Sequence, residues 1–199
     1  MSRKTHSIHF ILASSSPRRE ALFAELKVPF QITAPTVEEV IRTDLTLIKA
    51  LEFLAYQKAK SVADNLPTMT HHKIIISADT IVTLNQEILG KPQSQQHAID
   101  MLSALGGNDC DVITAYCILD QLTGEFRCNS VITQLKFKQI SADEIKAYVA
   151  TGDPMDKAGA FGIQGHAQKF IEKIDGDYDN VVGLPISDIK KTLESLGFL

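Results

Sequence analysis

A β-branched run over residues 73–84 carries a carboxylate near its middle, and this combination constrains the fold more than any other feature of the chain. The sequence KIIISADTIVTL is typical of a buried strand, because isoleucine, valine and threonine favour extended backbone. Asp79 interrupts the run within the tetrapeptide SADT. An ionised carboxylate is costly to bury unless it is paired or bound to a metal ion. The segment therefore predicts a core strand with a polar site beside Asp79.

A second polar segment, SSSPRR over residues 14–19, follows an apolar stretch over residues 7–13 that predicts a short strand. Serines followed by proline at the first helical position indicate the start of a helix. Hydroxyl groups, backbone N–H groups and guanidinium groups thus meet at a helix N-terminus, where phosphate binds readily. A plain helix cap with two solvated arginines explains the same residues equally well. The side chains concerned are Ser14, Ser16, Arg18 and Arg19.

Strand-like and helix-like segments interleave along the rest of the chain and predict a mixed sheet flanked by helices. A long helix is expected to begin at Asp44 or Thr46 and to end near residue 65, with Leu51 on its apolar face and Lys58 and Lys60 on the other. Further strands are expected at residues 30–34, 111–119, 128–137 and near 170–174, and further helices at residues 20–26, 94–105, 141–150 and 187–196.

The bulk properties limit the classes of function. With 199 residues the chain is expected to form one domain, residues 1–199. Its formal net charge of -4 argues against the broad basic surface that non-specific nucleic-acid binding needs. The apolar runs are too short to cross a bilayer and the first residues lack the apolar core of an export signal, so we expect a cytoplasmic protein without membrane contact. The three cysteines, Cys110, Cys117 and Cys128, are expected to be reduced, small buried residues.

Two short polar segments flank the predicted strand that carries Asp79. Glu38 and Glu39 follow the second expected strand, and hard cations such as Mg²⁺ take one or two carboxylates together with phosphate oxygens. Lys91 stands between a flexible glycine and a rigid proline, where its ammonium group could be held over a phosphate. Taken alone, the glutamates are also explained as surface loop residues and the lysine as an ordinary turn residue.

The glycine-rich segment over residues 152–165 is too long for a simple turn and carries Asp156, Lys157 and Gln164. Its glycines permit close approach of a ligand, so we interpret it as a substrate loop. The chain contains no GxxxxGK[ST] phosphate loop, no correctly placed dinucleotide fingerprint and no GxSxG elbow. The absence of these patterns argues against a kinase, a P-loop NTPase or a dehydrogenase. It favours water, activated by a carboxylate or a metal ion, as the attacking group.

Five segments, in this order, give the chain a resemblance to the Maf family of nucleotide pyrophosphatases. The resemblance implies an ITPase-like α/β fold with an elongated mixed sheet and a cleft between two lobes, and usually a homodimer. It also implies hydrolysis of a nucleoside triphosphate between the α- and β-phosphates, with Mg²⁺ or Mn²⁺ required. The segments are LASSSPRR (12–19), SADT (77–80), GKP (90–92), DKAGAFGIQG (156–165) and VGLP (182–185).

The resemblance also implies a role for each matching residue. The aspartate that matches Asp79 is assigned as the proton acceptor, and the carboxylate that matches Glu39 assists with the metal or the water. The hydroxyl groups of Ser14 and Ser16 would add contacts to phosphate. Residues that handle phosphate charge match Arg18, Arg19, Lys58, Lys91 and Lys157.

Three positions are linked by the resemblance to the choice of base, and the combination of Arg18, Thr80 and Gln164 looks like the branch that acts on dTTP and UTP. A glutamine amide can pair with the carbonyl and imide edge of a pyrimidine. The sister branch, which acts on methylated guanine nucleotides, usually has glutamate in place of Gln164. Phe161 stands where the family often has tyrosine, and Cys110 lies near a position that is often histidine.

Two alternative functions remain open at this level. The first keeps the enzyme and changes its substrate to methylated or otherwise modified nucleotides. The second is a nucleic-acid-binding or septum-regulating protein, which the history of the family suggests. The net acidity and the absence of interleaved aromatic and basic residues in the sequence weigh against the second.

Overall fold

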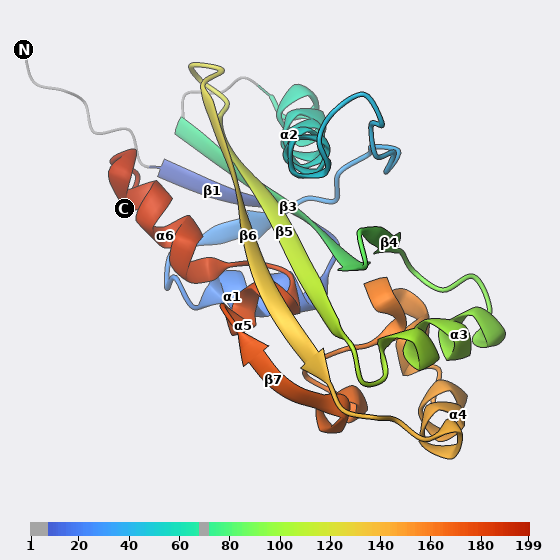
Figure 1. Cartoon of the computed structure of the whole chain (residues 1–199). Coiled ribbons are helices and arrows are strands. Elements are labelled where there is room, and N and C mark those ends of the chain that lie inside the picture. The colour runs from blue at the N-terminus through green and yellow to red at the C-terminus, as the bar shows by residue number, and fades with distance from the viewer. Residues whose placement is uncertain (1–7, 68–71) are drawn as a thin grey trace, which may run out of the picture. The chain divides into compact units, whose positions relative to one another are not determined.

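The computed structural model describes residues 8–67 and 72–199, and within these ranges seven strands join one mixed sheet (Figure 1). Their order is β2-β1-β3-β5-β6-β7, and β4 pairs with β3 outside this path. β1 is parallel to β2 and β3, whereas β4 and β7 are antiparallel to β3 and β6. The predicted mixed sheet is confirmed. The strands are β1 (Ile8–Ala13), β2 (Phe30–Ile32), β3 (His72–Leu84), β4 (Glu87–Leu89), β5 (Asp109–Asp120), β6 (Phe126–Phe137) and β7 (Ile171–Asp175).

The helices α1, α2, α3, α4 and α6 lie close to the positions that the sequence predicts. Thr46 precedes the long second helix, and Ser141 and Glu144 form the capping box expected from their spacing. No helix within the described ranges is long and apolar enough to cross a membrane. The helices are α1 (Pro17–Ala24), α2 (Leu47–Asn65), α3 (Gln95–Leu105), α4 (Ala142–Ala150), α5 (Tyr178–Val182) and α6 (Ile186–Ser195), with short 3-10 helices η1 (Asp153–Asp156), η2 (Ala158–Ala160) and η3 (His166–Phe170).

The chain divides into two compact units, and the division falls within β3, directly after Asp79. The single domain expected from the length of the chain stays a prediction. The first unit comprises Met1–Asp79, Ala115–Ser130 and Gly183–Leu199, and the second comprises Thr80–Thr114 and Val131–Val182.

The core of the first unit is built where α1 and α2 pack on the strands. Phe23 of α1 meets Phe10 of β1 and Phe30 of β2 edge to face, with ring centroids 6.4 and 4.9 Å apart. On α2, Leu51 and Leu54 are buried. Aromatic and aliphatic side chains thus hold both helices against the strands that lead into the polar segments.

The core of the second unit joins β6 to the glycine-rich segment and to α4. Phe137 packs edge to face on Phe161, and Tyr148 of α4 packs on Phe170, with ring centroids 5.0 and 5.6 Å apart. Buried Asn180 of α5 donates hydrogen bonds to the carbonyl of Val112 and to the hydroxyl of Thr133. The phenyl ring of Phe161 is therefore part of the core of this unit.

Several sequence-based expectations need correction. Lys58 does not lie on the solvent face of α2, because it is buried with Ala55 and Ala59, whereas Lys60 is exposed as predicted. Cys110 and Cys117 are free and buried, but Cys128 is only half-buried. The short strand β4, the helix α5 and the 3-10 helices were not predicted, since segments of three to five residues give too few positions for a periodic pattern.

A buried tyrosine ties the C-terminal helix to the hairpin of β5 and β6 in the first unit. The hydroxyl of Tyr116 donates to Asp188 of α6 over 2.7 Å and lies 2.7 Å from the hydroxyl of Thr192. Asn129 of β6 donates to the same tyrosine oxygen over 3.0 Å. Burial raises the pKa of Tyr116 to about 12, which keeps its proton in place to make the bond.

We expect Tyr116→Phe to lower the free energy of unfolding by about 1–3 kcal/mol, because it leaves partly buried Asp188 and Asn129 without their shared partner. Urea denaturation followed by circular dichroism measures this change. Tyr178→Phe is the matched control, since Tyr178 is 40% exposed. Equal denaturation midpoints for the two variants would contradict the role of this network.

Candidate functional site

The loop between β1 and α1 confirms the predicted helix start. Pro17 occupies the first position of α1, and the hydroxyl oxygen of Ser16 accepts the backbone N–H of Arg19 over 3.5 Å. The hydroxyl oxygen of buried Ser14 accepts the N–H of Ser16 over 3.1 Å. Two serine hydroxyls are therefore fixed at the N-terminus of an eight-residue helix, where the helix dipole favours an anion.

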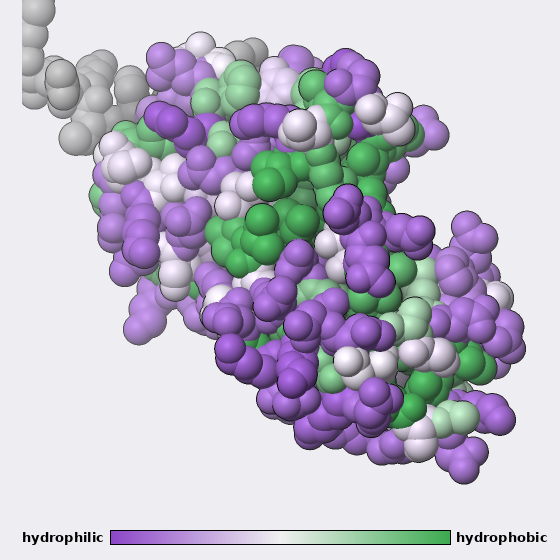
Figure 2. All heavy atoms as spheres, viewed as in Figure 1, coloured by the Kyte–Doolittle hydropathy of each residue, from purple (hydrophilic) through white to green (hydrophobic). Residues whose placement is uncertain are grey.

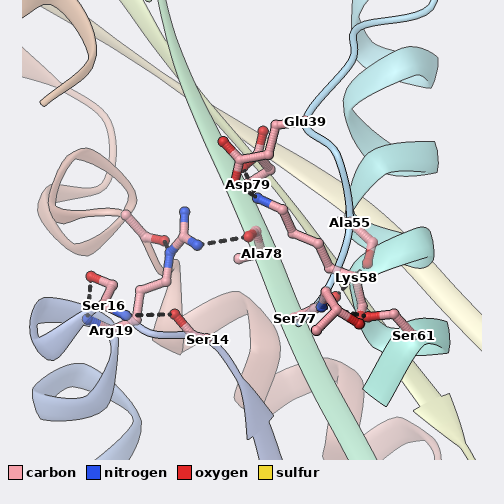
Figure 3. A network of polar contacts seen from close by, with 12 residues as sticks. Ser14, Ser16, Arg19, Glu39, Ala55, Lys58, Ser61, Ser77, Ala78 and Asp79 are labelled. Carbon is pink, nitrogen blue, oxygen red and sulfur yellow. Dashed lines mark hydrogen bonds and ion pairs between the residues drawn. The ribbon is translucent and has the colours of Figure 1, made fainter. Parts of the chain in front are cut away.

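Arg19 ties this helix to the strand that carries Asp79 (Figure 3). Its Nη1 donates to the carbonyl of Ala78 over 2.7 Å, and its Nε donates to the carbonyl of Gly183 over 2.8 Å. Burial lowers the pKa of Arg19, while the charges of Asp79 and Glu39 act in the opposite direction. The guanidinium group therefore remains charged and braces α1 against β3.

Lys58 joins the two carboxylates that the sequence analysis singled out (Figure 3). Its ammonium group forms ion pairs with Asp79 and with Glu39, the latter over 2.6 Å. The side chains of Lys58 and Asp79 are 5% and 13% exposed, whereas that of Glu39 is 55% exposed. Because both carboxylates converge on one cationic nitrogen, the charge of Asp79 is balanced within the first unit, as the sequence predicts for a carboxylate inside a core strand.

Local backbone geometry explains why Lys58 meets Asp79. Alternate residues of a strand share a face, so Ser77 and Asp79 point the same way from β3. The hydroxyl of Ser77 donates to the carbonyl of Ala55 over 2.6 Å and fixes α2 against this face. Lys58 lies one helical turn beyond Ala55, and its side chain reaches Asp79, the next residue on the same face of the strand. The role of Ser77 was not predicted, although a polar residue inside an apolar strand is a signal for it.

Four of the predicted residues, Thr80, Lys91, Lys157 and Gln164, lie in the second unit, and each has different neighbours. The hydroxyl of Thr80 is 2.9 Å from that of Thr114, which donates to the carbonyl of Asn180. Lys91 and Gln164 are exposed. In this unit the N–H of Gly159 donates to the carbonyl of Gly90 over 3.1 Å, which joins the lysine-bearing turn to the glycine-rich segment.

Lys157 is held by acidic groups of its own segment. Its ammonium group contacts Asp153 over 3.0 Å and Asp156 over 2.6 Å. Gly162 makes room for its methylene chain, since a Cβ at this position would lie 2.6 Å from Lys157 Cε. The lysine side chain therefore packs directly against the backbone of Gly162, and a larger residue there would displace it.

The structure thus brings together Ser14, Ser16, Arg19, Glu39, Lys58 and Asp79 in the first unit. Arg18 is half-buried on α1, beside Arg19, whose pKa its charge lowers. Among residues 8–67 and 72–199, no three histidine, cysteine, aspartate or glutamate side chains are grouped as ligands of a metal ion. A pair of converging carboxylates does suit Mg²⁺, which usually keeps waters and takes its other ligands from phosphate oxygens.

A mixed sheet with paired carboxylates held by a buried lysine defines the chain as an α/β protein with a charged site on its third strand. The family described as Maf-like protein matches residues 9–196. The chain belongs to this family.

Individual relatives agree with this assignment. The chain is 47% identical to the "dTTP/UTP pyrophosphatase" of Alkaliphilus metalliredigens, over 92% of this chain and 93% of the relative. It is 44% identical to proteins of the same description from Geobacillus sp., over 94% and 98%, and from Thermococcus kodakarensis, over 94% and 96%. A solved nucleoside-triphosphatase / dITP/XTP pyrophosphatase from Mycobacterium abscessus aligns with 94% of this chain and 97% of its own, at 12% identity and a TM-score of 0.47.

We expect Lys58→Met to lower the free energy of unfolding by about 2–3 kcal/mol, because it leaves Asp79 charged and mostly buried without its cation. This loss of stability is small for a broken buried ion pair, because the second partner of Lys58, Glu39, is largely solvated. Urea denaturation provides the measurement, with Lys60→Met on the same helix as control, since the Lys60–Asp64 pair is exposed. The double variant Lys58→Met/Asp79→Asn should regain part of the loss, and no recovery would show that the lysine does not act through Asp79.

Proposed function

We propose that this protein hydrolyses nucleoside triphosphates, dTTP and UTP above all, between the α- and β-phosphates to give a monophosphate and pyrophosphate. The proposal rests on one observation, the ion pair of Asp79 with Lys58 on a strand that Arg19 ties to α1. This link between a carboxylate and a helix whose N-terminus carries hydroxyl and N–H donors suited to phosphate supports the proposal. The relatives match the chain over most of its length and are described as dTTP/UTP pyrophosphatases, and we infer the reaction and the choice of bases from this description.

In the proposed reaction Asp79 accepts a proton from a water molecule as its oxygen attacks phosphorus in line. The bond to the bridging oxygen breaks and pyrophosphate leaves with the electron pair. Ser14 and Ser16 each accept a backbone N–H in the structure, and each hydroxyl retains a proton that it can donate to a phosphate oxygen. Lys58 offsets negative charge, and Arg19 positions the helix. We assign Arg18, Lys91 and Lys157 to further phosphate contacts, on the resemblance alone.

We propose that Asp79 and Glu39 hold one divalent cation, Mg²⁺ or Mn²⁺, together with oxygens of the substrate. The support is that both carboxylates already converge on the single positive charge of Lys58. A bound divalent cation would offset charge that builds up on the phosphates during cleavage.

We assign the choice of base to Arg18, Thr80 and Gln164, with the amide of Gln164 pairing with the pyrimidine edge. A pyrophosphatase for methylated or other modified nucleotides is the second candidate, because base contacts rest on a few exposed side chains such as Gln164. Turnover measured across natural and modified triphosphates, with pyrophosphate as the product detected, separates the two candidates.

The expected partners and location stay predictions. We propose a cytoplasmic homodimer without stable binding to nucleic acid or membranes. Sedimentation equilibrium measures the oligomeric state. Electrophoretic mobility shifts at several salt concentrations test the nucleic-acid-binding or septum-regulating alternative, and tight salt-sensitive DNA binding without any turnover of nucleotides would favour it over the enzyme.

We expect Asp79→Asn to lower kcat for dTTP by about 100- to 10,000-fold, because the amide cannot accept the proton. Monophosphate and pyrophosphate, released in equal amounts by the unmodified protein, are measured by ion-exchange chromatography. Asp64→Asn is the matched control, since Asp64 is an exposed carboxylate on α2. Release of diphosphate and inorganic phosphate instead would refute the proposed cleavage position.

Removal of divalent cations with a chelator is expected to abolish turnover of dTTP, and addition of Mg²⁺ or Mn²⁺ is expected to restore it. Glu39→Gln should raise the concentration of Mg²⁺ needed for half-maximal turnover, because one of two carboxylates is lost. Glu38→Gln, the neighbouring exposed residue, is the control. Full turnover in the presence of the chelator would contradict the metal requirement and leave the role of Asp79 open to the test above.

A further inference from the structure

Cys117 of β5 and Cys128 of β6 lie opposite one another in the first unit. The N–H of Asp120 donates to the carbonyl of Glu125, which sets the register of the hairpin. Three residues back along β5 and three forward along β6 bring Cys117 opposite Cys128. The bond from Asn129 to the hydroxyl of Tyr116, at the next step of the same register, supports this pairing.

The two thiols lie near enough for Cys128 to raise the pKa of Cys117. Because the pair at Asp120 and Glu125 is hydrogen-bonded, every second pair is too, and Cys117 with Cys128 falls on a non-hydrogen-bonded position. The Cα atoms of such pairs are about 4.5 Å apart, which is within the range of roughly 4.4–6.8 Å that a disulfide spans.

The two thiols differ in access to solvent. Cys117 is fully buried, whereas half-buried Cys128 lines a cavity of about 270 Å³ between α2 and β6. Its other lining residues are Lys49, Glu52, Phe53, Tyr56 and Phe126. Figure 2 shows apolar residues gathered on this face of the molecule, and Phe126 is 55% exposed.

The polar groups near the two thiols also differ. Lys49 bonds to Glu52 over 2.6 Å, and this bond raises the pKa of Lys49, with a smaller contribution in the same direction from Cys128. A lysine ammonium group thus lies near enough to interact with the sulfur of Cys128. Interaction with Cys128, followed by burial, raises the pKa of Cys117, which disfavours its thiolate and leaves Cys128 as the thiol that reacts first.

We propose that Cys117 and Cys128 form a reversible cross-strand disulfide by exchange with a small disulfide that enters this cavity. The Cys128 thiolate attacks one sulfur of the small disulfide, and the first small thiolate leaves. Cys117 then loses its proton and attacks the sulfur of Cys128, and the second small thiolate leaves. The protein gives up two protons and two electrons, and the small disulfide is reduced to two thiols. Cys110 takes no part, because burial raises the pKa of its thiol to about 12.

Peptide mass mapping after exchange tests the proposal. The full-length protein is incubated under native conditions with hydroxyethyl disulfide, and remaining thiols are then alkylated. We expect a peptide pair linked through Cys117 and Cys128, with Cys110 the one thiol of three still open to alkylation after unfolding. Dithiothreitol should reverse the link. Three alkylated thiols, or a disulfide between two copies of the chain, would overturn the proposal.

Single variants test the order of the two steps. Cys117→Ser should accumulate a stable mixed disulfide at Cys128, since the resolving thiol is lost, whereas Cys128→Ser should leave Cys117 unmodified because it is buried. Cys110→Ser should form the link like the unmodified chain. Circular dichroism melting of each reduced variant shows that it is folded. Modification of Cys117 in folded Cys128→Ser at the rate seen for Cys128 would refute the proposed order and the role of the cavity.

Discussion

The ammonium group of Lys58, held between two carboxylates, is the interaction on which the charged site depends. Two residues along a strand span about 6.6 Å, and three residues along a helix advance about 4.5 Å. The hydrogen bond from Ser77 to the carbonyl of Ala55 aligns the helix with the strand. The residues that follow on each element, Lys58 and Asp79, therefore meet. The carboxylate of Asp79 is therefore tolerated inside an otherwise apolar strand, because the helix packed on this strand supplies the ammonium group of Lys58. Breaking the register would leave both charges buried and unmatched.

Arg19 adds a second constraint on the same strand. Its bonds to the carbonyls of Ala78 and Gly183 connect three segments that are far apart in the sequence. A guanidinium group suits this role because its donors point in several directions and its charge persists on burial. The carboxylates of Asp79 and Glu39 favour that charge. The N-terminus of α1, with its two serines, is consequently fixed relative to the residue before Asp79. The segments around Ser14, Glu39 and Asp79, predicted separately from the sequence, therefore belong to one network in the first unit.

The sequence predicts most of the fold because long periodic segments dominate it. The strand around Asp79, the capping boundary at Ser16 and Pro17 and the capping box of α4 each follow from local chemistry. Lys58 is the exception, because its burial was not predicted. Helical periodicity assigns a lysine to the solvent face, and only the partner strand reveals that the apolar face of α2 holds a cation. The carbonyls of Ala78 and Gly183 escape prediction for a related reason, since a backbone oxygen carries no sequence signal and its role depends entirely on what packs beside it.

The charge balance of the network bears on how the proposed reaction would begin. The ammonium group of Lys58 donates a hydrogen bond to Oδ1 of Asp79, and a carboxylate oxygen engaged in this way is less available to a water molecule. The lysine is in reach of Glu39 as well, and Glu39 is more than half exposed. When phosphate brings further negative charge, the ammonium group can move its bonds toward phosphate and Glu39. The Oδ1 atom of Asp79 is then released from Lys58 and can approach a water molecule when the substrate is present. On this view the ion pair that stabilises the fold also restrains the base until a polyanion arrives, and the solvated second carboxylate is what makes that exchange possible.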